Sequence, residues 1–215
     1  MAKVRLEQGT GPVPILAAYP VVMVGSMVDG KPDLATVAWT GVAASVPPTI
    51  SIALQHHRYS LKGIRQNMVF SVNIPSVELI KETDFCGLVT GARVDKIERC
   101  NFNVFYGKLD KAPLIEQCPV VHACEVVQIL NLGSHELIIG RIVETYVSDT
   151  CLTDGRPDAN KIHPLIYVGR GYSEVGPFHG MAFQVGKTIG PDDKMDTLEE
   201  IERMRRTDLR PIPQE

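Results

Sequence analysis

The 215-residue sequence lacks several features that define large classes of protein. No apolar run approaches the roughly 20 residues that a membrane-spanning helix needs, and residues 1–8 lack the apolar core of a signal peptide. We therefore expect a cytoplasmic protein with no membrane partner. The net charge of −3 also argues against a broad nucleic-acid-binding surface, so no nucleic-acid partner is expected.

The cysteines and histidines show no metal-binding spacing. Five cysteines form an odd set without a C-x-x-C pair, and the six histidines include no H-x-x-x-H or H-E-x-x-H motif. We expect free thiols, no disulfide framework and no metal site. Cys86 stands close in sequence to a candidate binding segment at residues 90–96, although a free structural thiol remains its better explanation.

Signatures of the common nucleotide-binding and hydrolytic folds are also missing. There is no G-x-x-x-x-G-K-[ST] loop, and residues 169–174 lack the third glycine of the dinucleotide fingerprint and open no helix. No G-x-S-x-G elbow is present either. A P-loop or Rossmann site is therefore excluded, and no serine hydrolase site is indicated.

What the chain does contain is a series of short strand-like runs bounded by turn residues. We predict strands at residues 21–28, 34–40, 49–55, 69–74, 119–130, 136–147, 164–168 and 181–185. Helices are expected at 60–67 with Ser60 as N-cap, at 77–86 ended by Gly87, in a short turn after Asp95, and at 196–204. Many strands, few helices and no regular βαβ alternation favour a mainly β barrel.

Residues 34–48 hold the only tryptophan of the chain, Trp39, followed by small residues at 41–45 and by Pro47 and Pro48. We predict one strand, a sharp connection of small residues and a second strand. Small side chains let a flat ligand approach the backbone. Trp39 is equally explained as a core aromatic, and the segment alone does not choose between the two interpretations.

Two other segments offer anion-binding chemistry. Arg58 and Ser60 stand at the expected start of a helix, where free amides and the helix dipole favour an anion. Thr90, Gly91 and Lys96 add a hydroxyl, a permissive glycine and a second cation. Taken alone, each segment is equally explained by an ordinary cap or a solvated charge, and together they gain meaning only if the fold unites them.

Six ordered segments, taken together, strongly resemble the flavin reductase-like, FMN-binding split-barrel family, and within it the flavoredoxin branch. They are residues 36–41 with Pro47 and Pro48, 57–60, 70–73, 90–91 with 95–96, 133–135, and 164–167. The resemblance extends from about residue 19 to residue 187. It depends on the order and spacing of the segments, because no single one is specific.

The resemblance implies a mainly β, six-stranded Greek-key split barrel with a few peripheral helices. The FMN-binding domain would span residues 19–187, with an N-terminal extension at 1–18 and a C-terminal extension with a short helix at 188–215. A homodimer with FMN near the subunit interface is expected, with NADH or NADPH as co-substrate.

The resemblance also implies roles for individual residues. The ring of FMN would lie along Thr36, Val37, Ala38, Trp39 and Thr40, and near His135 and Tyr167. Its phosphate would be held by Arg58, Ser60 and Lys96, with Asn73, Thr90 and Gly91 supporting the ribityl chain or the phosphate. Asp33 matches a position often filled by asparagine, and because a carboxylate cannot donate a hydrogen bond, a ring-edge contact there is in doubt.

The leading functional hypothesis is an NAD(P)H-dependent flavin reductase that passes electrons through FMN to a partner protein, free flavin, ferric iron or oxygen. An FMN electron carrier reduced by a partner protein is the alternative. A third hypothesis keeps the barrel but gives it a haem, with His135 or His179 as axial ligand. No catalytic side chain is nominated, because a flavin carries out the redox step itself.

Overall fold

The computed structural model describes residues 2–8, 11–189 and 196–207. Its centre is a curved, seven-stranded antiparallel sheet with the strand order β5-β4-β8-β11-β12-β7-β6. These strands are β4 (Val22–Val28), β5 (Lys31–Val37), β6 (Thr40–Ser45), β7 (Pro48–Gln55), β8 (Val69–Ile74), β11 (Val120–Asn131) and β12 (His135–Val147). The mainly β class is confirmed, with seven strands in the main sheet where six were expected.

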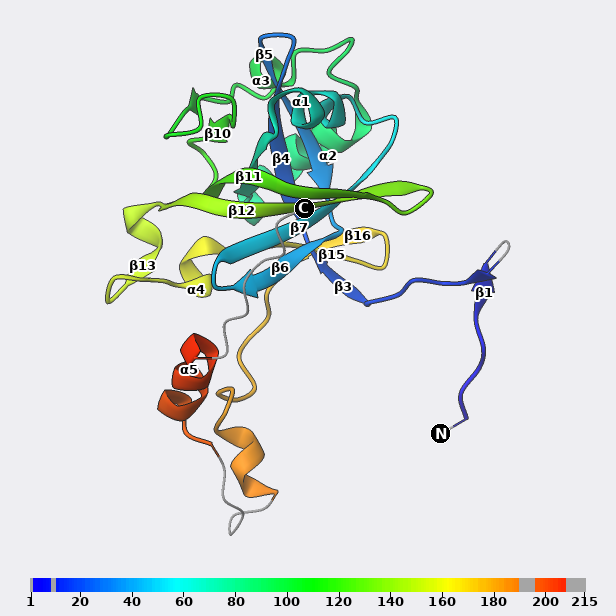
Figure 1. Ribbon diagram of the computed structural model, residues 1–215. Coiled ribbons are helices and arrows are strands. Elements are labelled where there is room, and N and C mark those ends of the chain that lie inside the picture. The colour runs from blue at the N-terminus through cyan, green and yellow to red at the C-terminus, as the bar shows by residue number, and fades with distance from the viewer. Residues whose placement is uncertain (1, 9–10, 190–195, 208–215) are drawn as a thin grey trace.

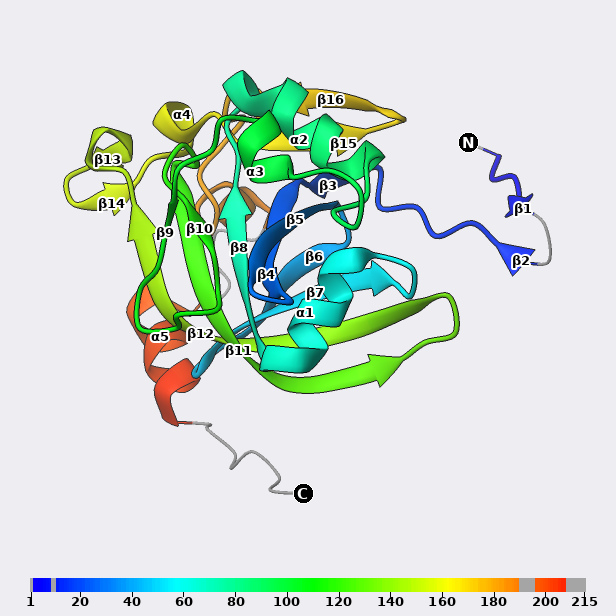
Figure 2. The same ribbon diagram turned by 90° about the horizontal axis from the view of Figure 1, so that it is seen from above.

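Smaller elements surround this sheet (Figures 1 and 2). A three-stranded sheet has the order β16-β15-β3, from Gly171–Glu174, Leu165–Val168 and Ala18–Pro20. Short pairs are β1 (Glu7–Gln8) with β2 (Gly11–Pro12), β9 (Val104–Phe105) with β10 (Leu114–Ile115), and β13 (Leu152–Thr153) with β14 (Arg156–Pro157). The helices are α1 (Tyr59–Asn67), α2 (Ile80–Leu88), α3 (Lys96–Arg99), α4 (Ala159–Ile162) and α5 (Leu198–Thr207), with 3-10 turns at Val77–Leu79, Asp149–Cys151 and Val185–Thr188.

The hairpin of β4 and β5 forms as its turn residues predict. Asp29 and Gly30 both have positive φ, 50° and 81°, which is the geometry of a two-residue turn that matches the twist of the flanking strands. The pairing runs from Val28 with Lys31 to Val22 with Val37. The hairpin therefore carries the segment that follows Asp33 along the edge of the sheet.

Alternation along the strands divides the buried residues between two cores. On β4, Val22 and Val24 belong to one cluster and Met23 to the other, and on β5 Ala35 and Leu34 divide in the same way. This is the two-residue period of a sheet that is covered on both faces. The first cluster fills the barrel beneath α1, and the second lies under α2, α3 and the pair β9–β10.

Helix α1 approaches the sheet closely because Gly63 has no side chain. A Cβ at this position would lie 2.5 Å from the Met27 carbonyl oxygen and 2.8 Å from Ser26 Oγ. Leu61 and Ile64 on the same helix enter the barrel core. The start of α1 is thereby fixed beside β5.

The structure corrects the prediction for the segment after Trp39. The small residues at 41–45 are not a loop but most of β6, which pairs with β7 from Thr40 with Ile52 to Ser45 with Pro48. The chain bends earlier, at Ala38 and Trp39, between β5 and β6. Small residues are tolerated on this strand because β6 is at the edge of the sheet and most of it faces solvent.

Three local predictions are also wrong. Ser60 is not the N-cap of α1. Arg58 holds that position and makes no side-chain capping hydrogen bond. The Ser60 hydroxyl instead donates to Asp33 inside the protein. Gly87 does not end its helix, which continues to Leu88. No strand forms at 181–185: residues 182–184 form turns, and Val185 begins a 3-10 helix.

Both ends of the chain extend away from the barrel (Figure 1). The N-terminal arm, residues 2–8 and 11–17, runs outward from β3, and the C-terminal helix predicted at 196–204 is present as α5. In the part of the chain that the structure describes, no helix has the length and apolar character needed to cross a membrane.

We predict that Gly63→Ala destabilises the protein by about 1–3 kcal/mol, because the added methyl group must push α1 away from β4. Urea denaturation measures the change. Gly176→Ala is the matched control, since a Cβ there meets nothing within 4 Å. Equal midpoints for the two variants would contradict the close packing of α1.

Candidate functional site

Four neighbouring cavities lie along β5, the bend at Trp39 and the start of α1. We name them the cationic cavity (about 210 Å³), the Asp84 cavity (about 300 Å³), the Trp39 cavity (about 430 Å³) and the apolar cavity (about 480 Å³). Arg58 lines the first three, and Ala38 lines the last three. The four cavities therefore adjoin one another, and we refer to them together as the groove.

The cationic cavity lies at the N-terminus of α1. Its wall includes Arg58, Ser60, Thr90, Arg93 and Lys96, and none of its lining residues is acidic. The first amides of a helix have no intrahelical acceptor and carry the positive end of the helix dipole. The fold thus unites the two segments that the sequence offered separately for anion binding.

Lys96 is buried in this wall, with 4% of its surface exposed. Its ammonium donates to the carbonyl oxygens of Leu34 and Cys86, the latter at 3.1 Å, and lies 3.4 Å from Asp33 Oδ1. These three partners account for the three hydrogens of an ammonium group. Lys96 therefore adds charge to the cavity wall, but its donors are already engaged inside the protein.

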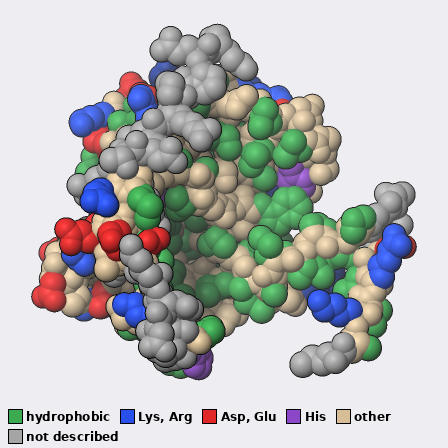
Figure 3. All heavy atoms as spheres, turned by 60° about the horizontal axis from the view of Figure 1, so that its bottom comes forward, with side chains coloured by type: hydrophobic (Ala, Val, Ile, Leu, Met, Phe, Trp, Pro, Cys, Tyr) green, Lys and Arg blue, Asp and Glu red, His purple; other side chains and the backbone are tan. Residues whose placement is uncertain are grey.

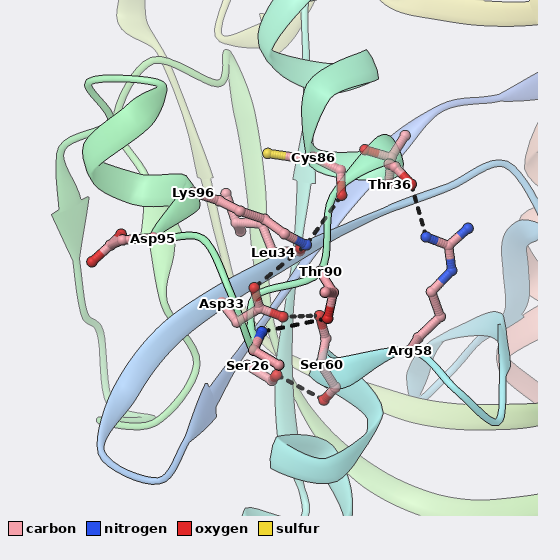
Figure 4. A network of polar contacts seen from close by, with 12 residues as sticks. Ser26, Asp33, Leu34, Thr36, Arg58, Ser60, Cys86, Thr90, Asp95 and Lys96 are labelled. Carbon is pink, nitrogen blue, oxygen red and sulfur yellow. Dashed lines mark hydrogen bonds and ion pairs between the residues drawn. The ribbon is translucent and has the colours of Figure 1, made fainter.

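Asp33 is the acidic partner at the centre of this network (Figure 4). Its carboxylate also accepts a hydrogen bond from the Ser60 hydroxyl. Gly91 passes directly over it, since a Cβ at position 91 would lie 2.0 Å from Asp33 Oδ1. Gly91 thus allows its backbone to pass close to the Asp33 carboxylate. The hydroxyl hydrogen of Ser60 is engaged by Asp33 and is not available to a ligand.

Arg58 reaches from the start of α1 to the end of α2. Its guanidinium donates to the Gly87 carbonyl oxygen at 2.9 Å. A guanidinium has five N–H donors, so Arg58 keeps donors beyond the one given to Gly87, and it lines three of the cavities. Thr36, beside Gly87, donates to the Thr83 carbonyl oxygen, which ties β5 to the same helix.

The Trp39 cavity brings together most of the other predicted residues. The predicted site residues that line it are Thr36, Val37, Ala38, Trp39, Arg58, His135 and Tyr167. The rings of Trp39 and His135 stack with centroids 4.5 Å apart, and 45% of Trp39 is exposed. Burial, together with the nearby positive groups of His56, Arg58 and His57, lowers the pKa of His135, which favours a neutral imidazole at pH 7. Because 45% of Trp39 is exposed, the interpretation of this residue as a core aromatic is wrong.

The Asp84 cavity lies between the cationic and Trp39 cavities. Tyr172 on β16 donates its hydroxyl to Asp84 Oδ1 on α2 at 2.8 Å, and the Tyr167 ring meets the Tyr172 ring edge-on at 5.9 Å. Burial and this carboxylate raise the pKa of Tyr172 to about 12, so its hydroxyl stays protonated. The carboxylate gives this cavity a chemistry different from its neighbours.

The apolar cavity continues the groove beyond Trp39. The N-terminal arm and the strands β6 and β7 line it, and Thr40 is one of its few polar residues. The Thr40 hydroxyl is engaged with the Ser51 carbonyl oxygen at 2.8 Å. Figure 3 shows apolar side chains gathered on this face of the molecule, beside the departing arm.

Asn73 is the predicted residue that the structure places elsewhere. It is fully buried, donates to the Met23 carbonyl oxygen and to Ser71 Oγ, and accepts from the Ile115 amide at 2.9 Å. Its polar atoms thus join β4, β8 and β10, and it lines none of the four cavities. Asp33 and Gly91 also line none of them. Asp33 contacts Lys96 and Ser60, which line the cationic cavity, and Gly91 packs against Asp33.

Several lining residues were not predicted from the sequence. Arg93, Asp84 and Tyr172 line the cavities but were not among the predicted site residues. The signal for Arg93 was local, because it stands three residues before Lys96. Asp84 and Tyr172 are 88 residues apart in the sequence, and no local pattern connects them.

The described residues include no group of three or more histidine, cysteine, aspartate or glutamate side chains that could hold a metal ion. All five cysteines are free. Cys86 and Cys100 approach to 4.0 Å between their sulfur atoms, and burial raises the pKa of both thiols, which keeps them protonated and unreactive.

Comparison with known proteins adds independent information. The model of the flavin reductase like domain matches residues 16–176. The chain is similar to the solved structure of flavoredoxin from Methanosarcina acetivorans, at 32% identity and a TM-score of 0.82, covering 88% of this chain and 100% of that one. Flavoredoxin of Desulfovibrio vulgaris (Miyazaki F) is 28% identical, with a TM-score of 0.77 and coverage of 85% and 100%. An uncharacterized protein of Archaeoglobus fulgidus is 31% identical over 60% of this chain and 73% of its own length.

We predict that Lys96→Met destabilises the fold by about 3–5 kcal/mol, because it leaves the Asp33 carboxylate buried without its counter-charge. The double variant Asp33→Asn with Lys96→Met should recover much of this loss. Urea denaturation of both measures the coupling. An unchanged midpoint for Lys96→Met would show that the lysine is not a structural support.

Proposed function

Because the chain belongs to the flavin reductase-like family, we propose that it binds FMN in the groove and uses it to pass electrons from NADH or NADPH to a downstream acceptor. The observation that carries this proposal is the order of the cavities. A cationic cavity at a helix N-terminus continues into a larger one walled by the Trp39–His135 stack. The two ends match the anionic and the planar parts of FMN.

The donor set of the cationic cavity suits a phosphate group. Arg58 and Arg93 supply guanidinium N–H groups, Thr90 supplies a hydroxyl, and the start of α1 supplies free amides. In the part of the chain that the structure describes, the Arg93 side chain has no hydrogen-bond or ion-pair partner, so its donors are available. Lys96 supports this site through its charge and through its hold on Asp33.

The Trp39 cavity suits a planar ring with one polar edge. Strand β5 is at the edge of the main sheet, so one side of its backbone has no partner strand. The Leu34 carbonyl oxygen is engaged by Lys96, so a ligand would meet the backbone farther along, at Thr36 and Val37. Trp39, His135 and Tyr167 supply flat apolar surface around the same space. When bound, FMN would supply the redox chemistry, and these residues would bind and orient it.

A non-enzymatic FMN electron carrier is the second candidate. The similarity to two flavoredoxins supports it, and so does the lack of a dinucleotide fingerprint in the sequence. In that case a partner protein would reduce the flavin, and NADH and NADPH would not.

We also propose that the apolar face in Figure 3 is the surface of a homodimer. The N-terminal arm exposes Ile15 and Leu16, and the segment after β16 exposes Phe178 and Met181. Ile15 and Leu16 line the apolar cavity, and the apolar side chains gathered on this face leave a wide surface open to solvent, which a second copy would cover.

An absorption spectrum of the purified protein with added FMN tests the proposal. We expect flavin absorption to stay with the protein through gel filtration. Anaerobic mixing with NADH and with NADPH then separates the two candidates: bleaching within the time of turnover identifies a reductase, and a flavin that stays oxidised identifies a carrier. A protein that is mixed with excess FMN and leaves the gel-filtration column without flavin absorption would exclude both the reductase and the carrier.

Arg93→Ala should weaken FMN binding about tenfold or more while leaving riboflavin binding unchanged, because the arginine is assigned to the phosphate that riboflavin lacks. Fluorescence titration of each flavin gives the two dissociation constants. Arg99→Ala is the control, because Arg99 is an exposed residue of α3 that carries the same charge and lies outside the cavities. Equal losses for both flavins would refute the assignment.

A further inference from the structure

The Asp84 cavity borders both the cationic cavity and the Trp39 cavity. It shares Arg58 and Leu88 with the cationic cavity, and Thr36, Ala38, Arg58 and Tyr167 with the Trp39 cavity. A ligand whose anionic group lies at the start of α1 and whose ring lies beside Trp39 therefore has its linking chain along this cavity.

Asp84 is the only acidic residue among the described residues that line these three cavities. A carboxylate accepts hydrogen bonds and donates none, so it favours hydroxyl groups and repels a second anion. The positive charge of Arg58 in the same cavity offsets part of the cost of placing a carboxylate near a phosphate site.

The orientation of Asp84 is fixed from the opposite wall. Tyr172 donates to Oδ1, and the Tyr167 ring packs against the Tyr172 ring. The raised pKa of Tyr172 keeps this donor in place across the physiological range. Oδ2 carries no hydrogen bond or ion pair to any residue that the structure describes, so it remains available as an acceptor.

We propose that Asp84 binds the hydroxyl groups of the polyol chain that joins the ring of the flavin to its phosphate, and that Tyr172 positions Asp84 for this contact. The inference rests on the proposed function, because it assigns the middle of the same ligand. It gives the groove three recognition points in order: phosphate at Arg93, polyol at Asp84 and ring at Trp39.

Three flavins that differ in their side chains test the assignment by fluorescence titration. FMN carries the polyol and the phosphate, riboflavin carries the polyol alone, and lumiflavin carries neither. Asp84→Ala should raise the dissociation constants of FMN and riboflavin about tenfold or more and leave that of lumiflavin unchanged. Asp84→Asn, which keeps the size of the side chain, should do the same by a smaller factor.

Two further variants complete the experiment. Tyr172→Phe keeps the aromatic packing but removes the orienting hydroxyl, and it should weaken riboflavin severalfold without affecting lumiflavin. Glu78→Ala removes an exposed carboxylate outside the cavities and should change none of the three constants.

Asp84 variants that lower all three affinities equally, or none of them, would overturn the polyol assignment while leaving FMN binding by the wild type intact. A wild-type protein that binds none of the three flavins would overturn the proposed function and this inference with it. The two failures are distinguishable, because the first appears only in the variants.

Discussion

The buried ion pair between Asp33 and Lys96 is the interaction on which the rest of the groove depends. It joins β5 to α3 directly, reaches α1 through Ser60 and reaches α2 through the Cys86 carbonyl oxygen. Removing one partner would leave an uncompensated charge in the interior, which is far more costly than removing both. Four elements that are distant in sequence are thereby held in one arrangement around the cationic cavity.

The parts of the fold that follow local rules could be predicted from the sequence. The β4–β5 hairpin follows from Asp29 and Gly30, and helix α1 from the spacing of Leu61 and Ile64. The strand β6 was missed, because the small residues at 41–45 are typical of a connection and only pairing with β7 makes them a strand. Tertiary pairing here overrides a weak local preference.

The same distinction applies to the site. The segments containing Trp39, Arg58 and Thr90 were identified by their order along the chain, and the structure brings them to one groove. The sequence could not reveal that the Lys96 ammonium is engaged by buried acceptors or that Asn73 joins three strands in the core. These outcomes depend on which polar groups meet after folding, and a residue type alone does not specify them.

The bend at Trp39 has one more consequence. This is the only indole in the chain, and it stands where the Trp39 cavity meets the apolar cavity, with nearly half of its surface open. All tryptophan emission from the protein therefore originates at a single point of the groove, beside His135. We therefore expect a ligand that binds beside Trp39 to change the intrinsic fluorescence of the protein, so its binding can be followed without an added label.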